Sequence, residues 1–207
     1  MKTIQFDPFN EIPVMETFYS LQGEGYYAGR SAYFIRVAGC DIGCVWCDVK
    51  ESWSVEKKQI TSINSVVDKC VTSNANFVVI TGGEPAKYDL SYLISALKAK
   101  KMNVAIETSG VYKLNSDIDW YCFSPKKFKS PCEQAYQKAD ELKIIVFNKS
   151  DLKWAENHAK KVSKNCILYL QPEWTKKESV TPLIIDYVKK NNKWKLSLQT
   201  HKYLNIP

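Results

Sequence analysis

Short apolar segments alternate along this chain with segments of helical spacing, and this alternation is the feature that most limits its fold. Strand-like runs rich in β-branched and aromatic residues are VMETFY, AYFIRVA, FVVIT, NVAIET, WYCFS, LKIIVF, ILYLQ and WKLSL. Helical spacing occurs between several of them, around residues 62–74, 89–101, 150–164 and 176–191. The pattern predicts a mostly parallel α/β sheet, and the nearly continuous apolar character of the strands indicates that both faces are covered.

The length of the chain narrows this architecture. A complete eight-fold β/α barrel usually needs about 250 residues, whereas this chain has 207. Several of the crossover segments are also too short for a full helix. We therefore expect a partial TIM-like barrel in one domain spanning residues 1–207, with its longest irregular segment at residues 124–138.

Composition limits the partners of the chain. Apolar residues make up 45% and charged residues 25%, which is typical of globular proteins. The first twenty residues contain acidic residues and prolines, and no run approaches the ~18 apolar residues of a membrane span. The net charge of +7 comes from scattered lysines, which favours solvated helix faces over a nucleic-acid site. We expect a cytoplasmic protein without a membrane or nucleic-acid partner.

Polar residues, glycines and prolines follow most of the predicted strands. The segments at these positions are GCDIGC, TGGEP, ETSG, SPK, QPEW and QTHKYLNIP. Because the carboxyl ends of parallel strands meet at one edge of a sheet, chemistry gathers there in α/β proteins. The pattern predicts that these segments share one site.

Three cysteines in the first of these segments, Cys40, Cys44 and Cys47, lie in a glycine-containing loop that can bend their sulfur atoms toward a common point. A structural zinc site usually has four ligands, and no second cysteine or histidine pair follows. Three thiolates suit a 4Fe-4S cluster whose fourth iron is open to another ligand. Spacing alone leaves a zinc site and a redox or structural thiol cluster as alternatives.

The other cysteines stand alone. The chain has seven cysteines, an odd number that argues against a disulfide framework. We interpret Cys70, Cys122, Cys132 and Cys166 as small buried hydrophobic residues. Of the two histidines, we expect His158 on a helix surface.

The segment CDIGCVWC resembles the CxxxCxxC signature of the radical S-adenosylmethionine enzymes, including the aromatic Trp46 before the last cysteine. The resemblance implies that S-adenosylmethionine chelates the open iron and that electron transfer then yields a 5′-deoxyadenosyl radical. TGGEP is similar to the glycine-rich segment of that family. There Gly82 and Gly83 let the backbone approach the methionine moiety, and Glu84 accepts from its ammonium group.

The segments YSLQGEGYYAGRSAYFIRVAGC and LQTHKYLNIP resemble the 7-carboxy-7-deazaguanine synthase family, and the likeness runs from Ser20 to Pro207. It implies conversion of 6-carboxy-5,6,7,8-tetrahydropterin to 7-carboxy-7-deazaguanine with release of ammonia, in queuosine and 7-deazapurine biosynthesis. S-adenosylmethionine would be regenerated as a cofactor. The resemblance also implies a homodimer that receives electrons from a flavodoxin or ferredoxin.

The same resemblance implies two sets of binding residues. Those for the pterin are Leu21, Gln22, Gly23, Glu24, Arg36, Thr81, His201 and the terminal carboxylate of Pro207. Those for S-adenosylmethionine are Gly82, Gly83, Glu84, Glu107, Ser109, Ser124, Pro125, Lys126, Gln171, Pro172, Glu173 and Trp174. In the first set, the planar donors of Arg36 suit the substrate carboxylate, although an ion pair at the surface is the alternative for this residue.

The chain departs from the family at Val49, where many members have a threonine that helps to bind Mg²⁺. Valine offers no side-chain oxygen to a hard cation, so either substrate oxygens, water and Asp48 or Ser52 hold the ion, or the enzyme depends on it less. We expect a weaker Mg²⁺ requirement than in relatives with the threonine. The alternatives for function are another radical enzyme, such as an activase of glycyl-radical enzymes, and a non-catalytic iron-sulfur protein.

Overall fold

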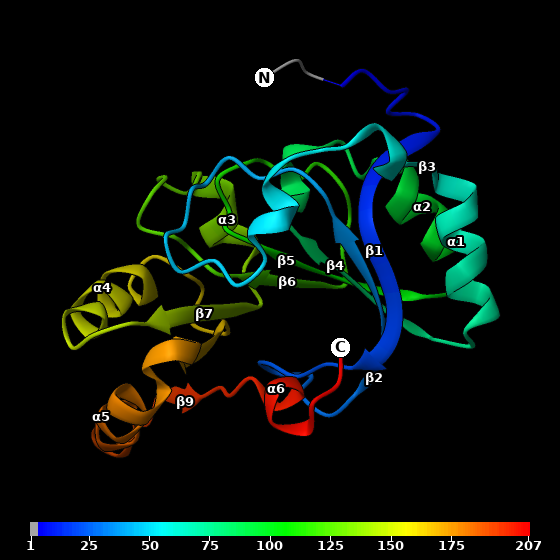
Figure 1. Ribbon diagram of the computed structural model, residues 1–207. Coiled ribbons are helices and arrows are strands. Elements are labelled where there is room, and N and C mark those ends of the chain that lie inside the picture. Colours follow the sequence, from blue (N-terminus) through cyan, green and yellow to red (C-terminus); the bar gives the residue numbers. More distant parts are fainter. Residues whose placement is uncertain (1–3) are drawn as a thin grey trace.

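A computed structural model describes residues 4–207 and contains one nine-stranded sheet with the strand order β3-β1-β2-β4-β5-β6-β7-β8-β9 (Figure 1). The strands are β1 (Glu11–Leu21), β2 (Ser31–Val37), β3 (Ile60–Ser62), β4 (Phe77–Gly82), β5 (Asn103–Thr108), β6 (Trp120–Phe123), β7 (Glu141–Val146), β8 (Ile167–Pro172) and β9 (Trp194–Leu196). From β2 through β4 to β9 all neighbours pair in parallel, whereas β1 is antiparallel to β2 and β3. Within residues 4–207 no pairing joins β3 to β9, so the predicted partial barrel is confirmed.

The helices are α1 (Ile63–Thr72), α2 (Ser91–Ala99), α3 (Glu133–Lys138), α4 (Ser150–Ala159), α5 (Lys177–Lys190) and α6 (Thr200–Leu204). The four predicted helices correspond to α1, α2, α4 and α5. The segment expected to be irregular, residues 124–138, ends in α3. Strand β3 and helices α3 and α6 escaped prediction because each is too short to show a period in the sequence.

Side chains of β4 alternate between the two faces of the sheet, and this alternation divides the core. Val78 and Ile80 belong to the larger cluster, in which α1 and α2 pack on the outer face. Phe77 and Val79 belong to a smaller cluster on the inner face, with Phe34 of β2. All four of these β4 residues are buried, as the unbroken apolar run FVVI predicts for a strand covered on both faces.

The loop between β1 and β2 covers the inner face at the amino ends of the strands. The Tyr27 ring lies 4.7 Å from Phe77, the first residue of β4, and 5.0 Å from Trp120, the first residue of β6. Tyr26 stacks on Trp120 at 4.7 Å, and the Arg30 guanidinium lies 4.1 Å above the Phe77 ring. The inner space is therefore closed at this end of the sheet and available at the carboxyl ends.

One histidine was placed wrongly by the sequence analysis. His158 is not on the surface of α4 but only 8% exposed, with its ring 4.3 Å from Trp154 and its Nδ1 2.9 Å from Tyr136 Oη. The helix turns this residue toward α3 and β6, where Phe123 also contacts it. Burial lowers the pKa of His158 to about 4, so it is a neutral core residue at pH 7.

The lone cysteines follow the prediction. Cys70, Cys122 and Cys166 are buried, Cys132 packs against the core, and all of them are free thiols. Within residues 4–207, no helix combines the length and apolar character that a membrane crossing requires.

Candidate active site

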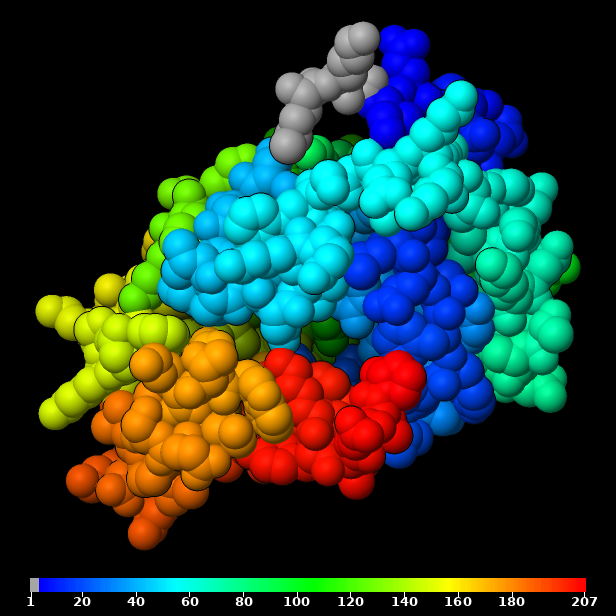
Figure 2. Space-filling view, in the orientation of Figure 1, coloured from blue at the N-terminus to red at the C-terminus, as the bar shows by residue number. Residues whose placement is uncertain are grey.

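A cavity of about 510 Å³ lies at the carboxyl ends of the strands and receives residues from all six predicted segments. Figure 2 shows a hollow between the cysteine loop, the β1 region and the C-terminal segment. Every predicted site residue lines this cavity except Pro125, whose neighbours Ser124 and Lys126 do. The structure thus brings the predicted residues together, while their individual roles remain predictions.

The three cysteines follow β2 in a loop with two left-handed glycines. Gly39 has φ 96° and Gly43 has φ 76°, a region that favours glycine. The loop returns to its own end, because Gly39 N donates to Ser52 O at 2.6 Å and Cys40 N donates to Trp53 O at 3.1 Å. Cys44 is buried, while Cys40 and Cys47 are partly exposed toward the same cavity.

The donor set of this loop fits a cluster better than a single ion. In the described part of the chain, no three histidine, cysteine or acidic side chains converge on one metal position. Three thiols that line one cavity suit a 4Fe-4S cube with one iron open, whereas a structural zinc site would take a fourth ligand. Burial raises the pKa of Cys44 to about 11, and a coordinated metal would deprotonate such a thiol.

The turn after β4 lies directly against the cysteine loop. Gly83 N donates to Val37 O at 2.8 Å, and Glu84 N donates to Gly39 O at 3.0 Å. A Cβ atom at Gly83 would stand 2.5 Å from Gly39 O, and one at Gly82 would stand 2.4 Å from both backbone N and O of Val37. Only residues without a side chain allow this close approach of two backbones.

Glu84 ties this turn to the end of β5. Its side chain is 1% exposed and accepts hydrogen bonds from Ala86 N at 3.1 Å and Ser109 N at 2.9 Å, and from the hydroxyls of Thr108 and Ser109. Four donors use the acceptor positions that a carboxylate offers. The predicted contact of Glu84 with a ligand ammonium stays untested, and the structure adds a bracing role.

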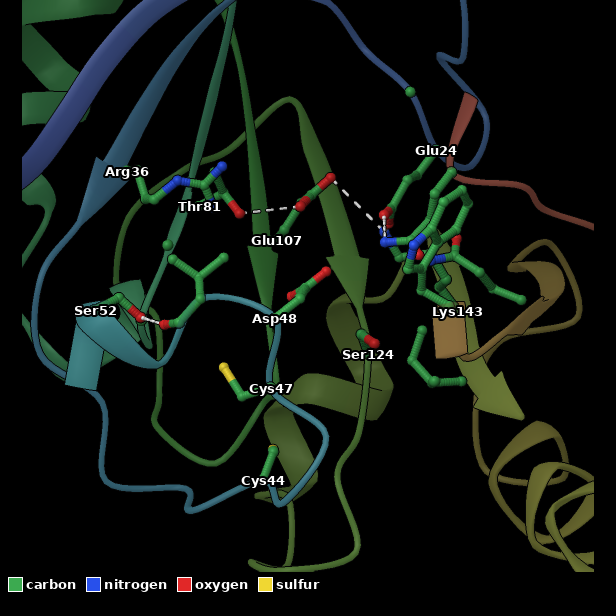
Figure 3. A pocket seen from close by; sticks show the side chains of 18 of the residues that line it. Glu24, Arg36, Cys44, Cys47, Asp48, Ser52, Thr81, Glu107, Ser124 and Lys143 are labelled. Atoms are coloured by element: carbon green, nitrogen blue, oxygen red, sulfur yellow. Dashed lines mark hydrogen bonds and ion pairs between the residues drawn. The ribbon is translucent and has the colours of Figure 1, made fainter. Parts of the chain in front are cut away.

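Glu107, predicted on the cofactor side, is linked to two predicted substrate residues. Its carboxylate accepts from Gln22 Nε2 at 3.0 Å and from Thr81 Oγ1 at 3.0 Å, as the dashed line in Figure 3 shows for Thr81. Gln22 also accepts from Glu24 N at 3.1 Å through its Oε1 atom. The turn after β1 is therefore joined to β4 and β5 by side chains.

Lys143 of β7 is a cavity residue that the sequence analysis missed. Its side chain is 5% exposed, forms an ion pair with Glu24, and has its Nζ 3.8 Å from Glu107 Oε1 (Figure 3). Burial raises the pKa of Glu24, but Lys143 and Gln199 outweigh this effect and bring it down to about 2. The signal was a lysine inside the apolar run LKIIVF, where a buried charge requires a partner.

The C-terminal segment packs on the turn after β1. Thr200 donates from its N atom and its hydroxyl to Gly23 O, at 2.9 and 3.0 Å. A Cβ atom at Gly23 would stand 2.1 Å from His201 Nδ1, so the glycine makes room for the histidine. Ser20 Oγ donates to Pro207 O at 3.0 Å. The two segments that carry the most specific resemblance are thus in contact.

Three of the remaining predicted residues, Arg36, Asp48 and Ser52, have partners within the chain. Arg36 lines the cavity and also forms the ion pair that was its alternative interpretation, with Nε 2.6 Å from Glu16 Oε1. Asp48 accepts from Lys202 Nζ at 2.6 Å, and Ser52 donates to Val49 O at 2.7 Å. Both side chains considered as substitute Mg²⁺ ligands therefore have partners within the chain.

Comparison with known proteins identifies the chain in two steps. Residues 21–119 match the family described as a 4Fe-4S single cluster domain, a match that includes the cysteine loop. The chain is similar to the crystal structure of QueE from Escherichia coli, with a TM-score of 0.84 and 30% identity over 91% of this chain and 94% of that one. Fold and site together define an enzyme of the radical S-adenosylmethionine class with a partial β/α barrel.

Curated relatives name the family. The chain is 54% identical to the 7-carboxy-7-deazaguanine synthase of Flavobacterium psychrophilum over 95% of this chain and 93% of the relative. It is 34% identical to the enzyme of the same name from Escherichia coli K12, over 95% and 99% of the two chains. The chain belongs to the 7-carboxy-7-deazaguanine synthase family.

Proposed function

We propose that this chain is a carbon-nitrogen lyase that converts 6-carboxy-5,6,7,8-tetrahydropterin to 7-carboxy-7-deazaguanine with release of ammonia. The observation that carries the proposal is one cavity lined by three cysteines together with Gln22, Glu24 and His201. The 54% identity to a relative of that name supports it. The reaction is a step of queuosine and 7-deazapurine biosynthesis.

The cysteine loop would hold the cofactor. Cys40, Cys44 and Cys47 would bind a 4Fe-4S cluster and leave one iron to S-adenosylmethionine. When bound, these groups supply the radical that takes a hydrogen atom from the substrate. The residues proposed to bind S-adenosylmethionine are Gly82, Gly83, Glu84, Ser109, Ser124, Pro125, Lys126, Gln171, Pro172, Glu173 and Trp174. Glu107, which the resemblance assigns to S-adenosylmethionine, is proposed to bind the pterin instead, because its carboxylate accepts from Gln22 and Thr81.

The opposite wall of the cavity would hold the pterin. The carboxylates of Glu24 and Glu107 accept hydrogen bonds, which suits the N–H groups on the pyrimidine edge of a pterin. Arg36 would leave Glu16, an exposed partner, and bind the substrate carboxylate with its planar donors. Phe18 and Phe34 stack at 5.0 Å beside these charges and line the cavity, where their rings exclude water.

Three finer features belong to the same proposal. The enzyme forms a homodimer, which would cover apolar edges left by the open barrel. A flavodoxin or ferredoxin supplies electrons, and the net charge of +7 suits an acidic donor. Mg²⁺ contributes less than in relatives with a threonine, because Val49 lines the cavity without an oxygen ligand.

The test is anaerobic reconstitution with iron and sulfide, followed by turnover with carboxytetrahydropterin, S-adenosylmethionine and a reductant. We expect 7-carboxy-7-deazaguanine and ammonia in equal amounts. The Cys44→Ala variant should form neither product, while the control Cys70→Ala, altered at a buried thiol outside the cavity, should form both. Cleavage of S-adenosylmethionine without a deazaguanine product would contradict the proposal and favour another radical enzyme.

A further inference from the structure

Lys143 lies at the centre of a buried group of charged side chains, and none of the predicted motifs contains this lysine. Its ammonium lies between Glu24, from the loop after β1, and Glu107, from β5. The exposed fractions of the three side chains are 5%, 15% and 24% for Lys143, Glu24 and Glu107. Figure 3 shows the lysine entering the cavity from the wall opposite Thr81. Three separate segments therefore meet at one cation.

Other ionisable groups lie near Lys143, but none of them is a second cation paired with the two carboxylates. Glu141 and Cys122 face it from β7 and β6, but the Glu141 carboxylate accepts from Tyr26 N at 3.1 Å and from Trp120 Nε1 at 3.2 Å. His201 of α6 faces Glu24.

The other nearby cation is also engaged elsewhere. Lys126, after β6, donates to Ser124 Oγ at 2.6 Å. Among the residues from 4 to 207, Lys143 is the only cation that forms an ion pair with Glu24 or Glu107. Within these residues, the negative charges of both carboxylates are therefore balanced by this one lysine.

Two carboxylates in a poorly solvated site repel each other, and one of them normally takes a proton unless a cation lies between them. Protonation would matter for recognition, because it turns an acceptor oxygen into an O–H donor. A donor facing the N–H groups of a ligand cannot form the hydrogen bond. The other contacts of the pair, from Gln22 and Thr81 to Glu107 and from Gln199 to Glu24, are neutral and cannot balance two charges.

We propose that Lys143 is the positioning residue that keeps Glu24 and Glu107 both ionised and directed at the N–H edge of a 2-aminopyrimidinone ring. This inference rests on the proposed function for the identity of the ring. Lys143 acts through the two carboxylates, and its own proton takes no part in the chemistry. The site then has one net negative charge, which complements a ring edge that only donates hydrogen bonds.

The first test is an infrared measurement on the substrate-free protein at pH 7. Lys143→Met should gain the band of a protonated carboxyl group relative to the wild type and to Lys143→Arg. Because burial also raises the pKa of Glu141, all variants are compared in a Glu141→Gln background. Adding Glu24→Gln or Glu107→Gln to Lys143→Met should remove it. The matched control is Lys127→Met, which should not gain this band. Lys127 also pairs with a buried carboxylate, Asp151, but that pair lies outside the cavity.

The second test is the pH profile for carboxytetrahydropterin. In Lys143→Met the affected carboxyl has a raised pKa, so it is protonated at low pH and ionises as the pH rises. We expect KM to rise about tenfold to a hundredfold near pH 7, with smaller change in kcat and recovery at higher pH. Lys143→Arg should keep the wild-type profile.

Two outcomes would overturn the inference. One is a Lys143→Met variant with no protonated carboxyl band and a pH profile parallel to that of the wild type, since a purely structural lysine predicts this. If Lys143→Met does not fold, the double variant Lys143→Met/Glu24→Gln can be measured instead, because it removes one charge of each sign. A protonated carboxyl band in the double variant would contradict the argument that repulsion between Glu24 and Glu107 causes the protonation. The infrared test uses no substrate, so its result is independent of the proposed function.

Discussion

The two walls of the cavity are held in different ways. The cofactor wall, formed by the cysteine loop and the turns after β4 and β5, rests mainly on backbone contacts between neighbouring strand ends, such as Gly83 N to Val37 O at 2.8 Å. The buried Glu84 carboxylate is a charged brace of this wall. The substrate wall, formed by the turn after β1, Lys143 and the C-terminal segment, rests on charged and amide side chains. Its contacts join residues far apart in the chain: Lys143 and Glu24 are 119 positions apart, and Gln199 and Glu24 are 175 positions apart.

Because they are held differently, the two walls should be sensitive to different kinds of substitution. A wall made of backbone approaches tolerates changes of pH but not of volume, because no side chain can move away. A wall made of ion pairs tolerates small changes of volume but depends on ionisation. Substitutions that change only volume or only charge should therefore separate the two walls.

The largest effect is expected from Gly83→Ala. Its new Cβ atom would meet the backbone oxygen of Gly39 at 2.5 Å and push the cysteine loop out of place. We expect reduced iron content after reconstitution and a loss of turnover of about a hundredfold or more, the usual consequence of displacing a reacting group by about 1 Å. Iron analysis and the visible absorption of the cluster check the first part.

Gly23→Ala is the matched control on the other wall. The nearest atoms to its Cβ belong to the side chain of His201, from Nδ1 at 2.1 Å to Cβ at 2.9 Å, and not to the cysteine loop. This variant should keep its iron and show a raised KM for the pterin instead. If both variants kept the wild-type iron content, the proposed difference between the two walls would be wrong.

A charge change should act on the substrate wall. Glu24→Gln leaves Lys143 without its nearest partner and should lower the free energy of unfolding at pH 7 by about 3 kcal/mol. The pKa of Glu24 is about 2 in the folded protein and 4.5 ordinarily, so the pair stabilises above pH 4.5 and loses this effect as the pH falls toward 2. Denaturant unfolding should show the difference between variant and wild type shrinking over that range.

The control for this experiment is Asp117→Asn, which removes an exposed ion pair with Lys98. Such pairs contribute little, so its stability should follow the wild type. A Glu24→Gln penalty that stays constant down to pH 3 would show that packing, rather than charge, holds this wall.

The same difference explains what the sequence could predict. The strands, the four longer helices and the cysteine loop are local patterns, and each could be recognised within about twenty residues. Lys143 was missed because its partners are supplied by other segments, although its position inside LKIIVF indicated a buried charge. His158 was misplaced because α4 is short and polar, and which of its faces is buried depends on α3, itself unpredicted.

The two histidines provide a smaller test. His201 lines the cavity beside Gly23, whereas His158 lies in the core. His201→Gln should raise the KM for the pterin about tenfold, as expected for the loss of one hydrogen bond to the substrate, and leave stability unchanged. His158→Gln should leave KM unchanged and remove a pH dependence of stability.

The sign of that dependence follows from its pKa. His158 has a pKa of about 4 in the folded protein and 6.5 ordinarily, so the unfolded chain takes up the proton first. Wild-type stability should therefore fall as the pH drops from about 6.5 to about 4, and thermal unfolding across this range should show the fall. If His201→Gln removed this fall instead, the assignment of the two histidines to site and core would be wrong.

The smallest effect concerns Mg²⁺. Val49 lines the cavity, so Val49→Thr places a hydroxyl oxygen where the sequence lacks one. Chelation should lower wild-type turnover only a few-fold, and the variant should respond more steeply and recover with added Mg²⁺. Val45→Thr is the control, because Val45 belongs to the same loop but is 68% exposed and outside the cavity lining. A wild-type enzyme that already loses nearly all turnover on chelation would show that oxygens other than that of residue 49 suffice for the ion.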